Sequence, residues 1–154
     1  MNAIRTILHP TDFSVCSQEA FELAGMLARS VGARLIVVHV VPQAVQVLGP
    51  QSGIPARAAD AMEADLQDYK REMKEKLHEL QDRRHQIALE HALCEGDAAA
   101  EILRTARNRD CDLIVLGTHG RSGLAHVLLG SVAEEVARNA PCPTVMVRVP
   151  EERQ

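Results

Sequence analysis

Aromatic residues are nearly absent from this sequence of 154 residues, which holds two phenylalanines, one tyrosine and no tryptophan. A base-stacking surface needs several exposed rings, so this scarcity argues against a protein that binds single-stranded nucleic acid. Positive charge is not in excess either, because the formal net charge is -4. A protein that follows a phosphate backbone needs a basic face. We therefore expect no nucleic acid polymer among the partners.

Long apolar runs are also missing. The longest, residues 35–41 (LIVVHVV), is much shorter than a bilayer requires and contains His39. Residues 1–14 lack the apolar stretch of a signal peptide. The four cysteines form no CxxC pair, which favours reduced, partly buried thiols over a disulfide framework. These absences predict a cytoplasmic protein without a membrane partner.

What is present is typical of one globular α/β domain, which we place at residues 1–150 with a C-terminal tail at 151–154. Hydrophobic residues make up 46% of the chain and are almost all aliphatic, as suits helices packed on a parallel sheet. Apolar runs of strand length alternate with segments in which apolar residues recur every three or four positions. This alternation predicts a single doubly wound parallel sheet of five strands. The expected strands are residues 4–9, 34–41, 87–94, 112–116 and 144–149, and the expected helices are residues 20–31, 57–84, 97–106 and 131–140.

Several of these helices carry boundary signals. Gly32 is expected to close the first helix, and Asp97 is expected to cap the third. The second helix is long and follows a proline-rich loop at residues 42–55. Within it Glu72 and Lys76 have the spacing of an ion pair. We expect this helix to lie on the sheet, and a coiled coil is the alternative.

The segment after the fourth strand, GTHGRSGLAHVLLGS, has the spacing G-x2-G-x9-G-S at Gly117, Gly120, Gly130 and Ser131. Gly117 falls where a buried strand ends, and Ser131 falls where a helix begins. Gly117 and Gly120 would permit positive φ and a close approach of the backbone to a ligand. Ser131 and Glu134 match the capping box S-x-x-E, which marks a helix N-terminus. Its free amides and the positive end of its dipole would meet phosphate there. The alternative is a tight surface loop without a ligand.

Topology predicts that a second turn meets this segment. Ligands of doubly wound sheets bind beyond the carboxyl ends of the strands, where the strand order reverses. If the order is 3-2-1-4-5, the reversal brings Pro10-Thr11-Asp12 beside residues 117–120. Other nucleotide-binding loops are excluded, because the sequence contains neither G-x4-G-K-[ST] nor a G-x-G-x-x-G after the first strand.

The sequence resembles the universal stress protein family, in its ATP-binding branch. The resemblance covers essentially the whole chain, and the complete G-x2-G-x9-G-[ST] motif is the branch's most specific marker. It implies a Rossmann-like, adenine nucleotide alpha hydrolase-like fold with strand order 3-2-1-4-5 and four flanking helices. It also implies a bound ATP, AMP or ADP and a homodimer that pairs through the strand at residues 144–149. The residues that carry it are ILHPTDFS (7–14), LIVVHVV (35–41), EGDAAAEIL (95–103) and the segment 112–147.

The resemblance further implies a set of site residues. Pro10, Thr11 and Asp12 would line the adenosine, and Val40 would offer backbone groups to the adenine ring. Asp12 could also orient a hydrated Mg²⁺, although no protein metal ligand is otherwise expected. The ribose and phosphates would be surrounded by Gly117, His119, Gly120, Arg121, Gly130, Ser131 and Val132.

A binding module is the function that these features favour: a cytoplasmic dimer that senses or carries ATP and regulates an unidentified protein partner during stress. The alternatives are a slow ATPase or autokinase and a nucleotide-free interaction module. Catalysis needs a positioned base. His119 is the only candidate within the loop, and an imidazole there can equally donate to phosphate or ribose. His9 and His39 lie in expected strands and are assigned to the core or the walls, so we expect no catalytic residue.

Overall fold

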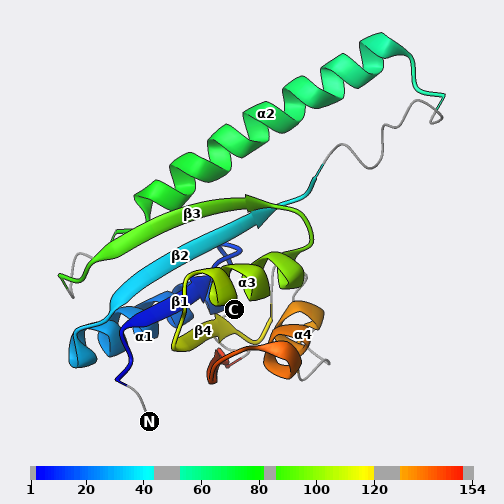
Figure 1. Cartoon of the computed structure of the whole chain (residues 1–154). Coiled ribbons are helices and arrows are strands. Elements are labelled where there is room, and N and C mark those ends of the chain that lie inside the picture. The colour runs from blue at the N-terminus through cyan, green and yellow to red at the C-terminus, as the bar shows by residue number, and fades with distance from the viewer. Residues whose placement is uncertain (1–2, 44–52, 82–85, 120–128, 151–154) are drawn as a thin grey trace.

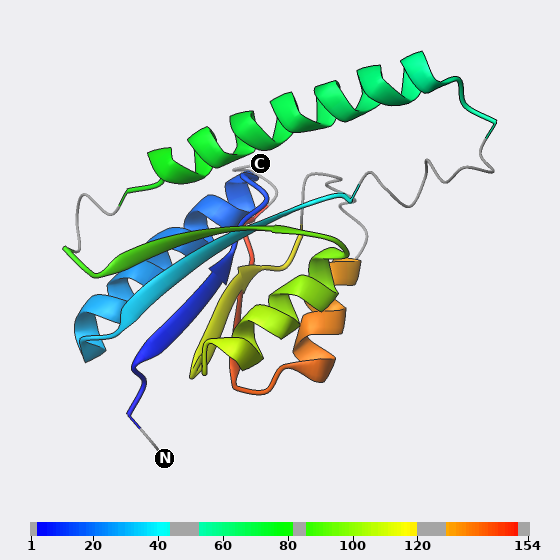
Figure 2. The same ribbon diagram turned by 45° about the horizontal axis from the view of Figure 1, so that its top comes forward.

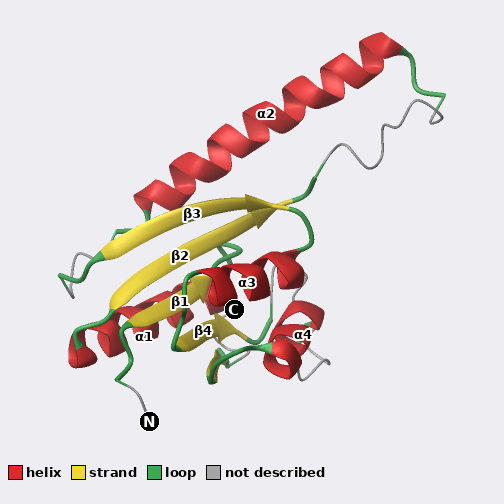
Figure 3. Cartoon of the chain, viewed as in Figure 1, coloured by secondary structure: helices red, strands yellow, loops and turns green. Residues whose placement is uncertain are grey.

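The structure, a computed structural model, describes residues 3–43, 53–81, 86–119 and 129–150. Strands and helices alternate along these ranges, as predicted (Figure 3). The strands are β1 (Thr6–Pro10), β2 (Arg34–Val41), β3 (Leu89–Glu95), β4 (Leu113–Gly117) and β5 (Thr144–Val147). The helices are α1 (Val15–Val31), α2 (Ala56–Glu79), α3 (Ala98–Asn108) and α4 (Ser131–Asn139).

The strands form one parallel sheet in the order β3-β2-β1-β4-β5, which confirms the predicted doubly wound topology. Strand β1 is central, and the chain winds outward from it in both directions. Helices α1 and α2 cover one face of the sheet, and α3 and α4 cover the other (Figures 1 and 2). Both faces are therefore buried, which explains why the inner strands are continuous apolar runs.

Alternation along each strand divides the core into two layers. In β1, Ile7 packs on the α1 side and Leu8 on the α3 side, and both are fully buried. In β2, Val37 and Val38 divide in the same way. The pleat thus supplies one apolar layer to each pair of helices.

The ends of α1 have local causes. The hydroxyl of Ser14 accepts a hydrogen bond from the Ser17 amide and caps the N-terminus. Gly32 closes the helix with φ of 69°, so the predicted C-terminal glycine is confirmed. Strand β1 begins at Thr6, later than predicted, because the Asp112 carboxylate accepts hydrogen bonds from the amides of Arg5 and Thr6.

Helix α2 differs from its prediction. It ends at Glu79 because Leu80 is extended, and only its C-terminal part packs on the sheet, through Met73 and Leu77. The N-terminal part extends beyond the sheet, and Met62 is 45% exposed there (Figures 1 and 2). The predicted contact with the sheet is thus correct for only part of the helix.

Further predictions concern the last strand, an ion pair on α2 and the thiols. Strand β5 ends at Val147, two residues before its predicted end. The predicted Glu72–Lys76 ion pair is present, with 2.8 Å between Oε1 and Nζ. All four cysteines are free thiols, and Cys16 and Cys111 are buried. Among the described residues, no helix has the length and apolarity to cross a bilayer.

Candidate functional site

A crevice opens beyond the carboxyl ends of β1 and β4, where the strand order reverses, as topology predicts. Its cavity volume is about 210 Å³. Gly120 and Arg121 lie outside the described residues, so the structure does not place them. The predicted site residues that the structure brings together in its lining are Pro10, Thr11, Asp12, Val40, Gly117, His119, Gly130, Ser131 and Val132.

The crevice also has lining residues that sequence reasoning missed. Ser17 and Thr118 add hydroxyl groups to one side. The apolar side is formed by side chains of β2, β4 and the first turns of α3 and α4. Burial of the β2 and β4 runs was a usable signal for Val38 and Leu116, but no sequence signal placed α3 here. The apolar lining residues that were not predicted are Val38, Ala98, Ile102, Leu116 and Ala133.

The N-terminus of α4 faces the crevice without a side-chain cap. Gly130 is the N-cap residue, with φ of -69° and ψ of 156°, and it cannot cap through a side chain. The amides of Ser131, Val132 and Ala133 have no hydrogen-bond acceptor in the described part of the chain, and all of these residues line the cavity. Such amides, with the positive end of the helix dipole, accept an anion.

The predicted capping box is therefore wrong, because the helix begins one residue earlier than that motif requires. Ser131 is the first helical residue and makes no capping hydrogen bond. Glu134 instead points forward, and its Oε1 lies 2.7 Å from Nη2 of Arg138. Ser131 and Glu134 thus leave the α4 amides open.

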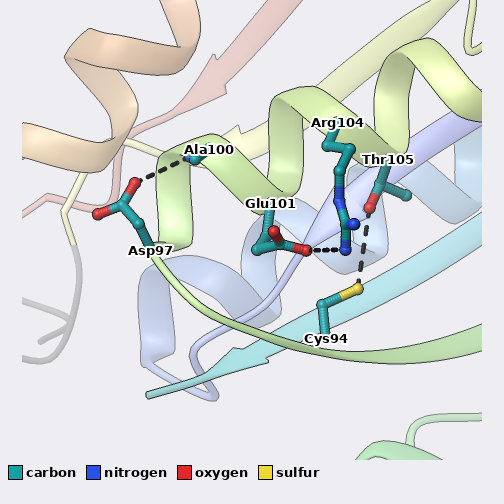
Figure 4. A network of polar contacts seen from close by, with 6 residues as sticks. All are labelled: Cys94, Asp97, Ala100, Glu101, Arg104 and Thr105. Carbon is teal, nitrogen blue, oxygen red and sulfur yellow. Dashed lines mark hydrogen bonds and ion pairs between the residues drawn. The ribbon is translucent and has the colours of Figure 1, made fainter. Parts of the chain in front are cut away.

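Helix α3 provides a contrast at the same crevice. Its N-cap, Asp97, accepts a hydrogen bond from the Ala100 amide at 2.9 Å, as predicted (Figure 4). One turn further along α3 Glu101 pairs with Arg104 (Figure 4). The Asp97 carboxylate supplies negative charge at the N-terminus of α3, so of these two helix starts only that of α4 is open to an anion.

Gly117 and Gly130 of the motif allow close contacts within the protein, and Gly117 lacks the positive φ that was predicted for it. A Cβ atom there would lie 3.0 Å from Sγ of Cys16 and 3.2 Å from its carbonyl carbon, so the absence of a side chain lets α1 approach β4. A Cβ at Gly130 would lie 3.1 Å from the carbonyl oxygen of Thr118, which accepts the Gly130 amide at 2.7 Å. Both glycines therefore shape the protein around the crevice.

Of the two strand histidines, His9 lies behind the crevice and His39 lines it, as expected for core and wall residues. His9 is fully buried, and burial lowers its pKa to about 4, against opposing effects of its hydrogen bond to Val115 and of Asp12. Its Nδ1 lies 2.9 Å from the carbonyl oxygen of Val115. Nδ1 of His39 lies 2.7 Å from the carbonyl oxygen of Thr11 and holds that turn in place.

Asp12 is the acidic residue of the crevice lining. Its Oδ1 accepts a hydrogen bond from the Ser14 amide at 3.0 Å, which orients the carboxylate within the turn. Among the residues that the structure describes, no three histidine, cysteine or acidic side chains come together as a metal-binding group. A cation at Asp12 would therefore depend on water and on the ligand for its other contacts.

Fold and crevice define a doubly wound α/β domain with a helix start that has no side-chain cap at its switch point. The sequence profile described as "Universal stress protein family" matches residues 3–148, and the chain belongs to this family. It is 34% identical over 151 residues to universal stress protein MJ0531 of Methanocaldococcus jannaschii, covering 97% of this chain and 85% of that protein.

Solved structures of the family have the same fold. Universal stress protein UspA from Lactobacillus plantarum matches with a TM-score of 0.75 at 24% identity, over 96% of this chain and all of that one. A universal stress protein in complex with cAMP matches with a TM-score of 0.59 at 25% identity, over 95% of this chain and 98% of that one. A structural relative of this chain thus binds an adenine nucleotide.

Proposed function

We propose that this protein binds ATP or a related adenine nucleotide in the crevice and acts as a nucleotide-dependent regulatory module in the stress response. The observation that carries the proposal is the open N-terminus of α4, whose amides at residues 131–133 line the cavity. Phosphate is the ligand group that such amides hold best. The cAMP complex of a relative supports the choice of an adenine nucleotide.

The two sides of the crevice suit the two ends of a nucleotide. The apolar side can bury an adenine ring, and the backbone of Val40 at the end of β2 can pair with the ring edge. Pro10, Thr11 and Asp12 would contact the nucleoside. Gly117, His119, Gly130, Ser131 and Val132 would surround the ribose and phosphates, joined by Gly120 and Arg121. Asp12 could orient a hydrated Mg²⁺ beside the phosphates.

Dimerisation through β5 is the second part of the proposal. Strand β5 is at the edge of the sheet, pairs with β4 on one side, and is half-buried along its length. An edge strand with apolar residues is a ready surface for pairing with a second copy. The proposed module is therefore a cytoplasmic homodimer that presents its nucleotide state to a protein partner.

The direct test is to identify what the purified protein carries. Protein isolated by gel filtration is denatured, and the released small molecules are identified by mass spectrometry; titration calorimetry with ATP, AMP, GTP and adenosine then measures affinity. We expect co-purifying adenine nucleotide, and tighter binding of ATP than of adenosine. Absence of adenine nucleotide together with no measurable binding of ATP or AMP would overturn the proposal.

A further inference from the structure

Two hydroxyl groups, those of Thr11 and Ser17, lie in contact in the crevice wall. Ser17 Oγ donates to Thr11 Oγ1 at 2.7 Å. Thr11 Oγ1 also accepts a hydrogen bond from the Phe13 amide at 3.1 Å. A hydroxyl oxygen has two lone pairs and one hydrogen. Because both lone pairs of Thr11 are engaged, its hydroxyl can interact further only as a donor.

His9 and Thr11 both lie within reach of the Ser17 hydroxyl. A carbonyl oxygen can only accept, so Nδ1 of His9 carries the hydrogen that faces Val115. Burial keeps the ring neutral at physiological pH, with a pKa of about 4, and its Nε2 is then an acceptor. Nε2 lies 3.5 Å from Ser17 Oγ, whereas Thr11 Oγ1 lies at 2.7 Å. Nε2 could accept the Ser17 hydrogen only over the longer distance, and Ser17 Oγ donates to the nearer oxygen of Thr11.

The hydroxyl hydrogen of Thr11 is left over at a buried position. Thr11 is 7% exposed and Ser17 is 3% exposed, and both line the crevice. The described part of the chain provides no acceptor for the Thr11 hydrogen. A buried donor without an acceptor is unfavourable, so a ligand atom that accepts this hydrogen gains from a group that is already oriented.

We propose that Thr11 is a specificity-determining hydrogen-bond donor of this site, and that Ser17 is the positioning residue that fixes its direction. The inference rests on the proposed nucleotide site and adds to it that, in one contact, Thr11 donates the hydrogen bond and the ligand accepts it. The ligand must present an acceptor to Thr11, either an unprotonated ring nitrogen or a ribose oxygen. A ligand that presents an N–H group at the same place is rejected, because two donors then face each other.

The first test compares ATP affinities by calorimetry in four variants. Thr11→Val keeps the shape and removes the hydroxyl, and we expect about tenfold weaker binding. Thr11→Ser keeps the oxygen and should restore affinity to within about threefold. Thr105→Val, a matched change on α3 that does not line the crevice, should leave affinity unchanged. Ser17→Ala should weaken binding by about three- to fivefold.

A double-mutant cycle separates positioning from a merely structural role of Ser17. If Ser17 acts through Thr11, Ser17→Ala has no further effect on ATP affinity in the Thr11→Val background. Fully additive losses would overturn the positioning role. Thermal melts show which variants are folded, and Thr11→Ser keeps the test open if Thr11→Val does not fold.

Nucleotide analogues identify the ligand atom that accepts the Thr11 hydrogen. A loss of affinity for one analogue can be measured in the natural protein, without a variant. The probes are 1-deaza, 3-deaza and 7-deaza ATP and the 2′- and 3′-deoxy forms. One of them should lose about tenfold in the natural protein and nothing further in Thr11→Val. If Thr11→Val binds ATP and every analogue as the natural protein does, the donor role is wrong while the nucleotide site stands. If the natural protein binds no adenine nucleotide, both the site and this inference fail.

Discussion

A negative charge placed at the first residue of α4 should separate the stability of this helix from its proposed role. Ser131 is exposed, is the first helical residue, and makes no capping hydrogen bond. Ser131→Asp puts a carboxylate beside the open amides of α4. The helix should gain from this carboxylate, and a bound phosphate should be repelled by it. Stability should therefore rise while affinity for the phosphate falls. Overpacking or misfolding would lower both.

The magnitudes follow from simple electrostatics. An acidic residue in the first turn stabilises a helix by about 0.3–1 kcal/mol. For a domain of this length each kcal/mol raises Tm by about 2–4 °C, so we expect a rise of about 1–3 °C. Repulsion between the carboxylate and a phosphate nearby, reduced by solvent at this exposed position, amounts to about 1–2 kcal/mol. ATP should therefore bind about five- to thirtyfold more weakly.

The assay is calorimetric titration of ATP and of adenosine, alongside thermal melts in the absence of nucleotide. Ser131→Asn is the matched control, since it has the shape of the aspartate without its charge. Adenosine has no phosphate, and its affinity should be unchanged in both variants. The reasoning fails if adenosine loses as much affinity as ATP, or if the asparagine variant is as weak for ATP as the aspartate variant.

Further substitutions test the fold around the crevice. Gly117→Ala forces a Cβ to 3.0 Å from Sγ of Cys16 and should lower the free energy of unfolding by about 1–3 kcal/mol in urea melts; no loss would show that α1 can retreat. Met73→Ala should cost about 2–5 kcal/mol, and Met62→Ala less than about 0.5 kcal/mol, in the same melts, because the two side chains are 2% and 45% exposed; equal costs would mean that the projecting part of α2 is also packed. The lowered pKa of His9 favours its neutral form in the folded state, so its contribution is complete above pH 6.5 and falls by about 3 kcal/mol as the pH drops to 4. His9→Gln should flatten the stability profile over this range, and an unchanged slope would contradict the assignment.

The sequence predicted the sheet well because its signals are local. The apolar run of β2 indicates burial on both faces, and the strand order follows from the alternation of elements and the family resemblance. Boundaries set by contacts distant in sequence were less accessible. Strand β1 begins late because Asp112, more than a hundred residues away, binds its first amides. How far α2 extends beyond the sheet depends on where the strands end. The spacing of apolar residues within α2 does not show this.

The sequence predicted many of the residues that line the crevice, but not the N-cap of α4 or the hydrogen bonds among the lining residues. The motif placed Gly130 and Ser131 at a helix start, yet a Ser-x-x-Glu pattern cannot say which residue is the N-cap. The hydrogen bond from Ser17 to Thr11 joins a helix to a turn, and the buried ring of His9 lies beside it. Such networks arise from packing, and no spacing along the chain predicts them.

The uneven capping of the helices supports a ligand at α4. The side chains of Ser14 and Asp97 cap α1 and α3 and stabilise each helix by about 1 kcal/mol relative to alanine, whereas the N-cap glycine of α4 forgoes only a few tenths of a kcal/mol. Helix α2 also lacks a side-chain cap, but it begins at exposed residues where water can serve. At α4 the open amides face a cavity with apolar walls, where a ligand can supply the missing acceptor. Binding there would complete the helix start and raise Tm with nucleotide concentration, so the helix that lacks a cap is the one through which the nucleotide would stabilise the fold.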